Sequence, residues 1–567
     1  MASPSFPEHF VHVPPTPIAE VDALVDKLYD RRQAWVGTSV AERIALLRAC
    51  VDATLSVAEE WVAAASRAKG IEGPRTGEEW LGGPMTLLRN LRLYIEALEA
   101  GGQPKVPAMR QRPDGQWIAT VFPQNTLDKL MFTGFTGEVW IEPGKEPTQG
   151  RLYVDKRAGK VSEGGVALVL GAGNVASIGP MDALYKLIVD DEVVIIKTNP
   201  VNAYLSPAWK KAFAPLIEAD FVHVVDGGAE VGQHLCQHAK IHSIHITGSD
   251  ATHDAIVWGG DPAERERRKA SNEPLLTKPI TSELGCVTPV LVVPGPWSDK
   301  QIRYQARQVA GMVANNGSFN CNAAKVLVVA EGWDRKEKFL QAVREELART
   351  PARRAYYPGA KDRYGRFVER YPEHEVLGAT GEGVVPWTLL PKVPATKGEY
   401  ALTNEAFCGV LAQVELPVAS VVDFMKEAVR FANDDCWGTL SCMILIDKTS
   451  EQELGPHFDQ ALADLRYGGI GVNCWAALVY GLVVTTWGAF PGHTLHDIQS
   501  GIGVVHNALF FDHPQKSIVR APFIINPTPV WFADHKTQDK MGRALADFEA
   551  KPGFGSFLKV LPAALRG

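Results

Sequence analysis

The sequence predicts an α/β protein built from two doubly wound α/β domains in series. Continuous apolar runs alternate with helix-like segments along two parts of the chain, which is typical of parallel sheets covered by helices on both faces. The apolar runs of the first series are 166–170, 193–196, 221–225 and 241–246. The second series starts at 289–293 and continues with a helix near 301–315, an apolar run at 326–329 and a helix at 335–349.

The N-terminal part of the chain has a different pattern. Residues 18–35 carry apolar side chains at helical spacing, and Ser39 with Glu42 forms a capping-box signature before a helix that runs towards Lys69. A third helical pattern covers about 84–100. Residues 116–157 are rich in Thr, Val and aromatic residues between Gly and Pro, which indicates an extended arm.

The composition is that of a globular protein of two or three domains, because 567 residues with 46% hydrophobic content exceed one ordinary core. A formal net charge of -7 disfavours nucleic acids and anionic membranes as partners. The uncharged stretch 467–492 is long enough to cross a bilayer, but its Gly, Asn, Thr and Pro residues favour buried strands and turns.

The cysteine pattern predicts a reducing compartment. Eight cysteines are scattered without a CxxC pair, and residues 1–15 carry no apolar signal region. We therefore expect free thiols and a cytoplasmic location. The cluster His234, Cys236, His238, His242 and His245 crosses from a helix into a strand, which separates the side chains, so we expect no metal site.

A glycine-rich turn follows the first apolar run. The segment from Gly171 through Gly173 and Asn174 to Ala176 fits the relaxed fingerprint GxGxxG/A between a strand and a helix. The ordinary fingerprint has an acidic residue at the end of the next strand, to hold ribose hydroxyls. Lys197 occupies that position, so the ordinary dinucleotide fold is not predicted by this motif alone.

Three further motifs carry groups that do chemistry. Glu283 is a carboxylate just before a buried strand, and Cys321 is a thiol in a loop between a helix and a strand. Glu405 stands two residues before the aromatic Phe407. Together with Asn174, Lys197 and the turn Thr247, Gly248, Ser249, their order and spacing resemble the aldehyde dehydrogenase superfamily over roughly 164–473, more than half of the chain.

The resemblance implies oxidation of an aldehyde to a carboxylic acid through a covalent cysteine thiohemiacetal and thioester. Cys321 would be the nucleophile, which must react as a thiolate. The side-chain amide of Asn174 and the backbone N–H of Cys321 would hold the oxyanion. Glu283 would be the general base that activates water to hydrolyse the thioester.

The same resemblance implies NAD or NADP as the cofactor. Lys197 and Glu405 would hold ribose hydroxyls, and Phe407 would pack near the nicotinamide. The turn Thr247, Gly248, Ser249 opens a helix, and Ser249 would offer backbone N–H groups to the pyrophosphate. Pro200 stands where NAD-preferring members carry a glutamate, so the choice between NAD and NADP stays open.

Two departures from the family pattern affect the site. Cys321 comes four residues after Gly317 instead of three, and it stands four before Lys325, a spacing seen in the acyl-CoA-forming branch. A one-residue shift in the loop is the simplest account. His253 replaces the glycine that usually follows the Thr-Gly-Ser turn, so the pyrophosphate packing is expected to differ.

These arguments predict the following organisation of the chain. We expect a flexible arm at 1–15, a dinucleotide-binding α/β domain at 16–280 with an inserted extended arm at about 116–162, a catalytic α/β domain at 281–490, and a C-terminal segment at 491–567. The cofactor would lie in the cleft between the domains. The arm and the C-terminal segment are expected to make the contacts of a homodimer or homotetramer.

Two alternatives stay open. In a CoA-acylating dehydrogenase, CoA would accept the acyl group; the cysteine-to-lysine spacing and the pair Asn315, Asn316 favour it, whereas Glu283 disfavours it. A catalytically silent protein on the same fold would have no selectively reactive thiol. The sequence does not identify the aldehyde; Trp475, Tyr480, Trp487 and Phe490 would suit either an apolar funnel or an ordinary core.

Overall fold

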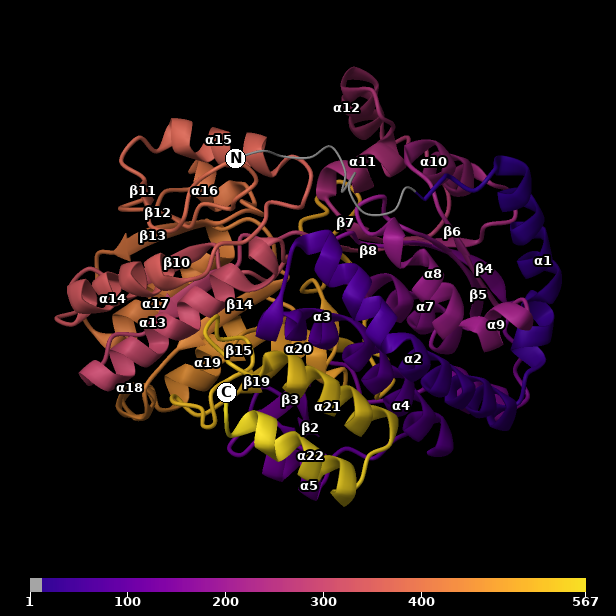
Figure 1. Ribbon diagram of the computed structural model, residues 1–567, viewed down its shortest axis with the longest axis horizontal. Helices are drawn as coiled ribbons and strands as arrows, with labels where there is room; N and C mark the ends of the chain where they lie inside the picture. Colours follow the sequence, from indigo (N-terminus) through magenta and orange to yellow (C-terminus); the bar gives the residue numbers. More distant parts are fainter. Residues whose placement is uncertain (1–12) are drawn as a thin grey trace.

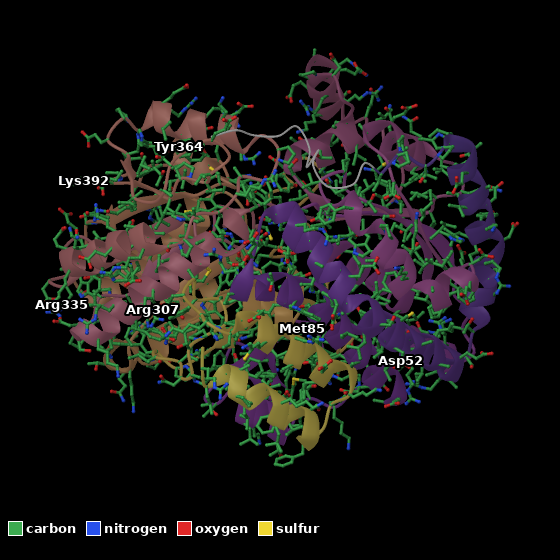
Figure 2. The ribbon with its side chains drawn as sticks, viewed as in Figure 1. Asp52, Met85, Arg307, Arg335, Tyr364 and Lys392 are labelled. Carbon is green, nitrogen blue, oxygen red and sulfur yellow. The ribbon has the colours of Figure 1, made fainter. Side chains whose placement is uncertain are left out.

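The computed structural model describes residues 13–567, so most of the predicted N-terminal arm lies outside the described range. Two lobes, each built on one large sheet, lie side by side, and the C-terminal helices lie below them over the arm (Figure 1). Figure 2 shows the side chains on this ribbon, with Met85 of the N-terminal half next to the C-terminal helices.

The first lobe contains a sheet of order β17-β8-β7-β4-β5-β6 among the described residues. Its strands are β4 (Gly165–Leu170), β5 (Glu192–Lys197), β6 (Val222–Val225), β7 (Ser243–Gly248), β8 (Ile280–Leu284) and β17 (Gly501–Ile502). Strands β4 to β8 run parallel, and β17 pairs antiparallel with β8, Gly501 opposite Glu283. The predicted domain boundary at residue 281 falls within β8, so the first sheet continues to Leu284.

The second sheet has the order β1-β2-β3-β19-β15-β14-β9-β10-β13-β12-β11 in the described part of the chain. Its strands are β1 (Ala108–Gln111), β2 (Trp117–Phe122), β3 (Thr136–Ile141), β9 (Pro289–Val292), β10 (Val326–Ala330), β11 (Glu375–Val376), β12 (Thr388–Leu390), β13 (Val410–Leu416), β14 (Ser441–Leu445), β15 (Gly469–Val472) and β19 (Pro514–Arg520). A short pair, β16 (Trp487–Gly488) with β18 (Val504–Val505), lies apart.

Helices cover both sheets, as the alternating pattern predicts. In the first half of the chain they are α1 (Ile18–Gly37), α2 (Val40–Lys69), α3 (Gly77–Trp80), α4 (Thr86–Glu99), α5 (Thr126–Met131), α6 (Arg151–Arg157), α7 (Ile178–Ile188), α8 (Ser206–Ala212), α9 (Ala214–Glu218), α10 (Ala229–Gln237), α11 (Asp250–Trp258) and α12 (Pro262–Ser271). In the second half they are α13 (Asp299–Ala314), α14 (Lys336–Arg349), α15 (Ala360–Arg370), α16 (Tyr400–Thr403), α17 (Val421–Asp434), α18 (Lys448–Leu454), α19 (Pro456–Asp464), α20 (Ala477–Leu482), α21 (Gln538–Ala550) and α22 (Phe554–Ala564).

The predicted α/β fold class is confirmed. The capping box is present, since Ser39 accepts from the backbone of Glu42 and the Glu42 carboxylate accepts from the backbone of Ser39. The helical segment between β5 and β6 is divided into α8 and α9, because the chain turns at Phe213 and Pro215 starts a new helix. Hydrophobic periodicity and capping signatures therefore predict that an element is present better than they predict the residues at which it ends.

The predicted arm differs from the expectation in two ways. Besides strands it contains the helices α5 and α6, and it belongs to the second sheet, not to the first lobe. The cause is strand pairing: β3 pairs antiparallel with β19, and β19 pairs parallel with β15. The backbone groups of β19 are therefore paired on both sides within one chain, and subunit contacts through the arm stay a prediction.

The C-terminal segment was predicted least well. The short apolar runs at 518–519 and 523–525 of this segment suggest strands. The first run is part of β19, but residues 523–525 form no strand, and the helices α21 and α22 were not predicted. Helix α22 is apolar on both its inner and outer faces, with Phe557 and Val560 buried and Phe554 and Leu565 exposed. This distribution hides the helical period, which depends on one apolar and one polar face.

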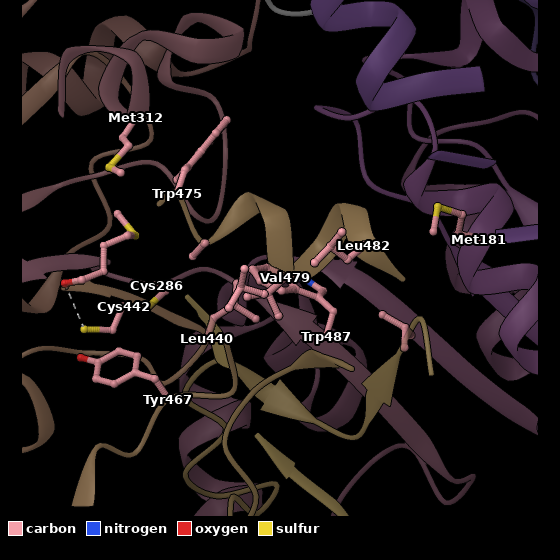
Figure 3. Packing of buried hydrophobic residues seen from close by; sticks show 14 of the residues in the cluster. Met181, Cys286, Met312, Leu440, Cys442, Tyr467, Trp475, Val479, Leu482 and Trp487 are labelled. Carbon is pink, nitrogen blue, oxygen red and sulfur yellow. Dashed lines mark hydrogen bonds between the residues drawn. The ribbon is translucent and has the colours of Figure 1, made fainter. Parts of the chain in front are cut away.

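One large core joins the two lobes, with a smaller cluster under α22. Figure 3 shows part of the large core, where Val479, Leu482 and Trp487 of the stretch 467–492 lie buried. All eight cysteines are free thiols. Among the described residues, no helix combines the length and apolar character needed to span a bilayer.

A buried ion-pair cluster attaches α21 to the N-terminal half. The Glu549 carboxylate lies 2.7 Å from the Arg89 guanidinium and 2.6 Å from that of Arg92. Burial opposes the ionisation of Glu549, but the two arginines outweigh burial and hold the pKa of Glu549 below its ordinary value.

We predict that Glu549→Gln lowers the free energy of unfolding by about 3 kcal/mol, because removing one partner leaves buried charge uncompensated. Urea denaturation at neutral pH measures the effect. The matched control is Glu59→Gln, whose exposed pair with Arg543 is expected to contribute less than about 1 kcal/mol. Equal effects of the two variants would contradict the role of burial.

Candidate active site

Two cavities meet at Cys321. A cleft of about 1130 Å³ lies at the carboxyl ends of β4, β5 and β7, and a narrower cavity of about 340 Å³ lies on the other side of the thiol. Cys321, Glu283 and Ile178 line both spaces. The half-buried thiol is therefore reached from two directions, which suits a group that reacts with two different molecules.

The loop that carries Cys321 follows the end of α13. Asn316, Gly317 and Ser318 have φ values of 52°, 68° and 69°, so three successive residues turn in the left-handed region. The Asn320 side chain lies within the loop, where it donates to Asn315 and accepts from Asn316. This turn accommodates the additional residue, and it leaves Cys321, not Asn320, at the boundary of the two cavities.

A buried polar network holds this loop from the N-terminal side. The Lys69 ammonium lies 2.9 Å from Glu79, and it donates to the carbonyl of Asn174 at 2.8 Å and to Oδ1 of Asn316 at 3.0 Å. The Tyr356 hydroxyl donates to the same Oδ1 at 2.9 Å. Sequence reasoning missed Lys69, Glu79 and Tyr356, because no local motif marks partners this far apart in the chain.

A second buried ammonium holds the loop from the other side. Lys325 donates to the carbonyl oxygens of Cys321 at 2.8 Å and Asn320 at 3.1 Å, and its Nζ lies 3.2 Å from the Glu405 carboxylate. The sequence analysis used Lys325 only as a spacing landmark. Its position just before β10 is the signal that would have identified it, since it places the ammonium beneath the thiol loop.

The thiol and the carboxyl group of the site are both protonated at rest. Burial raises the pKa of the Cys321 thiol well above its ordinary value, and Glu283 raises it further, while the Lys325 ammonium lowers it. Burial also raises the pKa of Glu283 to about 8, and the nearby Asp182 adds to this shift. Oε1 of Glu283 is buried without a hydrogen-bond partner among the described residues. A carboxyl group with a pKa near 8 accepts and returns a proton readily close to neutral pH.

Asn174, the predicted oxyanion residue, lines the larger cleft together with Cys321. Its side chain is buried, and its amide nitrogen donates to the carbonyl of Phe319 at 3.0 Å. A primary amide has two N–H groups, so one of them is left for an oxyanion. Within the described residues, nothing accepts a hydrogen bond from the backbone N–H of Cys321.

The predicted cofactor residues all line the larger cleft. Lys197 ends β5, and burial lowers the pKa of its ammonium to about 8. In the described part of the chain, no hydrogen bond or ion pair occupies this ammonium. An almost buried cation without a partner that faces a cleft is suited to hydroxyl or phosphate oxygens.

The remaining cofactor candidates surround the same cleft. The first turn of α11 lines the cleft beside Thr247 and Gly248, and its N–H groups already have partners within the turn: that of Thr252 donates to the Ser249 side chain, and that of Ala251 donates to the Asp250 carboxylate. Glu405 lines the cleft, although Lys325 and the backbone N–H of Cys286 already contact it. Phe407 lies with its ring centroid 5.0 Å from that of Tyr357.

The aromatic residues proposed as a funnel separate into two groups. Trp475 and Tyr480 line the narrow cavity, and the indole N–H of Trp475 donates to the carbonyl of Asn322. Trp487 interacts with Glu283. Phe490 packs near the Lys516 ammonium and lines neither cavity.

The histidine cluster has separate partners. His234 contacts Asp22 at 2.6 Å, whereas His242 contacts Glu192 at 2.5 Å. No group of three His, Cys, Asp or Glu side chains in the described range has the arrangement of a metal site.

Comparison with known proteins gives a consistent result. The model of the aldehyde dehydrogenase family matches residues 165–359. A Staphylococcus aureus protein (strain MSSA476) named "Putative aldehyde dehydrogenase" is 24% identical over 291 residues, which cover 47% of this chain and 57% of that protein. The chain thus spans little more than half the length of the curated relatives it matches.

Solved structures agree over most of the fold. An NADP-dependent glyceraldehyde-3-phosphate dehydrogenase from Bacillus halodurans, complexed with NADP, has a TM-score of 0.60 at 16% identity and covers 91% of this chain and 95% of its own. An indole-3-acetaldehyde dehydrogenase in complex with NAD+ has a TM-score of 0.59 at 17% identity, covering 89% and 90%. At these identities the likeness demonstrates a shared fold.

The raised pKa of Glu283 has a consequence for stability. Below pH 4.5, its ordinary value, the carboxyl group is protonated in both the folded and the unfolded chain, so it has no effect there. As the pH rises through about 8, the unfolded chain gains from ionisation that the folded chain resists, so stability is lost.

We predict that Glu283→Gln raises the free energy of unfolding at pH 7 by roughly 3 kcal/mol, because glutamine requires no such protonation. Thermal unfolding of both proteins across a pH series measures the difference. This gain in the free energy of unfolding should vanish in acid and grow towards pH 8. A gain that does not change with pH would contradict the raised pKa of Glu283.

Proposed function

We propose that this chain, which belongs to the aldehyde dehydrogenase superfamily, oxidises an aldehyde to a carboxylic acid with NAD or NADP. The observation that carries the proposal is the position of Cys321 beside Glu283, at the junction of a large cleft and a narrow cavity. The relatives complexed with NADP and with NAD+ support a nicotinamide dinucleotide in the cleft.

The first step joins the aldehyde to the cysteine. Glu283, in its ionised form, takes the proton of the Cys321 thiol, and Sγ attacks the carbonyl carbon of an aldehyde held in the narrow cavity. The oxygen becomes an oxyanion, to which the Asn174 amide and the Cys321 backbone N–H donate. The Lys325 ammonium under the loop stabilises the negative charge that passes from the thiolate to this oxygen.

The second step releases the acid. The bound cofactor supplies the acceptor for the hydride that leaves the thiohemiacetal carbon, and a thioester stays on Cys321. Glu283 releases the thiol proton to solvent and then accepts a proton from a water molecule, which attacks the thioester carbonyl; the C–S bond breaks, and Glu283 returns this second proton to the sulfur of Cys321. The sum is aldehyde, water and oxidised cofactor converted to acid, reduced cofactor and a proton.

The residues of the cleft fit a dinucleotide. Lys197 presents a cation without a hydrogen-bond partner in the described chain, as ribose hydroxyls or a phosphate require. A pyrophosphate would lie at the start of α11, where it would replace the Ser249 and Asp250 side chains as the acceptor of N–H groups, and Glu405 and Phe407 line the same cleft. A homodimer or homotetramer and a cytoplasmic location stay predictions.

The same experiments distinguish the proposed function from two alternative functions. Glu283 next to the thiol favours water over CoA as the acyl acceptor, because hydrolysis requires a base. Acyl-CoA formed in preference to free acid would support the CoA-acylating alternative. The absence of any selectively reactive thiol would support a catalytically silent protein.

We predict that Cys321→Ala abolishes aldehyde oxidation and leaves cofactor binding within about twofold, because the residue contributes the nucleophile and not the cleft walls that hold the cofactor. Cofactor reduction and cofactor fluorescence measure the two properties. Cys50→Ala is the control, since that cysteine is buried far from the site in α2. Turnover by Cys321→Ala would place the nucleophile elsewhere.

We predict that Glu283→Gln gives one burst of reduced cofactor after preincubation at alkaline pH and then stalls at the acyl-enzyme, with a steady rate reduced on the order of 100-fold. Mass spectrometry of the intact chain measures the acyl group on Cys321. In the unaltered enzyme, the steady rate should rise with pH through about 8, as Glu283 ionises. An unchanged steady rate in the variant would exclude Glu283 as the base.

A further inference from the structure

We propose that the narrow cavity binds the unbranched apolar chain of a long aliphatic aldehyde, and that the C-terminal helices α21 and α22 form its outer wall. This inference rests on the proposed aldehyde oxidation and specifies its substrate class.

The cavity connects the thiol with the surface through apolar side chains. At the inner end it is lined by Cys321, Trp475 and Leu478, and at the outer end by residues of α21 and α22. Further apolar lining comes from Met85 and Leu482, and the residues of α21 and α22 include Met541, Leu545, Phe557 and Val560. Figure 3 shows Trp475 and Leu482 among the buried residues near α20, and Figure 2 places Met85 next to the C-terminal helices.

The size of the cavity suits a chain better than a bulky group. About 340 Å³ is at the low end of the range of about 300–1,000 Å³ for ligand sites, although this volume extends from the thiol to the surface. Three of its lining residues are the methionines Met85, Met131 and Met541. Methionine is flexible and unbranched, so it adapts to an apolar chain in several conformations.

The charged residues of the wall neutralise one another. Of the lysines and arginines that line the cavity in the described chain, Lys69 is paired with Glu79, and Arg89 is paired with Glu549. Glu78 is paired with Arg353. No cation is therefore left for a carboxylate or phosphate on the substrate, and burying such an anion without a partner is strongly unfavourable.

The outer end of the cavity is apolar as well. Leu130, Leu561 and Leu565 line it and are 54%, 36% and 75% exposed. Helix α22 is held by a small cluster of Phe548, Phe557 and Val560 that is separate from the main core. An apolar rim on a helix with this limited packing is suited to admit a hydrocarbon chain, because the transfer of such a chain out of water is favourable.

This wall belongs to the part of the chain outside the family match, which ends at residue 359. On this proposal, the substrate class depends on residues of α21 and α22 that the sequence motifs do not include.

Cofactor reduction with propanal, hexanal and decanal tests the proposal. Each methylene that enters the apolar cavity should raise kcat/KM about threefold until the cavity is filled. An aldehyde with a terminal carboxylate, such as succinic semialdehyde, should have a kcat/KM at least tenfold lower than that of hexanal, because its carboxylate would be buried without a cation as partner. A flat or falling series, or equal reaction of the anionic aldehyde, would overturn the assignment.

Matched variants locate the effect. Met541→Trp shortens the cavity, so the preference for decanal over propanal should fall at least tenfold. Leu545→Phe is a milder second variant, and thermal unfolding checks that it folds. Leu558→Trp is the control, because Leu558 is 47% exposed on α22 and does not line the cavity. An equal loss of the preference for decanal in Leu558→Trp, or no loss in either cavity variant, would contradict the proposal that α21 and α22 form the wall of the cavity.

The proposed function and this inference fail in different ways. If no aldehyde of any length forms an acyl group on Cys321, the proposed oxidation itself is wrong. If propanal is oxidised and forms that group but longer chains bring no gain, only the substrate class is wrong.

Discussion

Two buried ammonium groups hold the loop that carries the reactive thiol. Lys69 donates to Asn316 and to the carbonyl of Asn174, and Lys325 donates to the carbonyl of Cys321. Since each ammonium is paired with a carboxylate, Glu79 or Glu405, the loop is fixed without excess charge. The left-handed turn at 316–318 depends on these contacts, because its strained backbone needs partners that over-determine it.

The same arrangement determines the chemistry of the site. A thiol next to a buried carboxyl group resists ionisation, since two negative charges would lie together in a poorly solvated place. Protonation of both Cys321 and Glu283 at rest avoids this conflict, and the Lys325 ammonium opposes part of the rise of the thiol pKa. Glu283, the proposed general base, is thus a residue whose burial opposes stability.

The sequence predicts what local patterns encode. The alternation of apolar runs and helices and the Ser39 capping box are found where they were expected, and the motif residues Asn174, Glu283 and Cys321 line the same cleft, while their catalytic roles stay predictions. Lys69 and Tyr356 were not predicted, because their shared partner Asn316 stands 247 and 40 residues away in the chain, beyond the reach of a local motif. Helix α22 was missed for another reason: its two apolar faces give no periodic signal.

The C-terminal segment connects stability with substrate choice. Glu549 anchors α21 through Arg89 and Arg92, and the carboxylate and Arg89 also line the narrow cavity. The ion pair of Arg89 with Glu549 therefore holds the outer wall in place. It also neutralises the positive charge that would otherwise attract an anionic aldehyde. A change that freed either arginine would loosen the wall and expose a cation towards the substrate. Apolar selectivity at this site consequently depends on a neutralised charge as much as on the surrounding hydrocarbon.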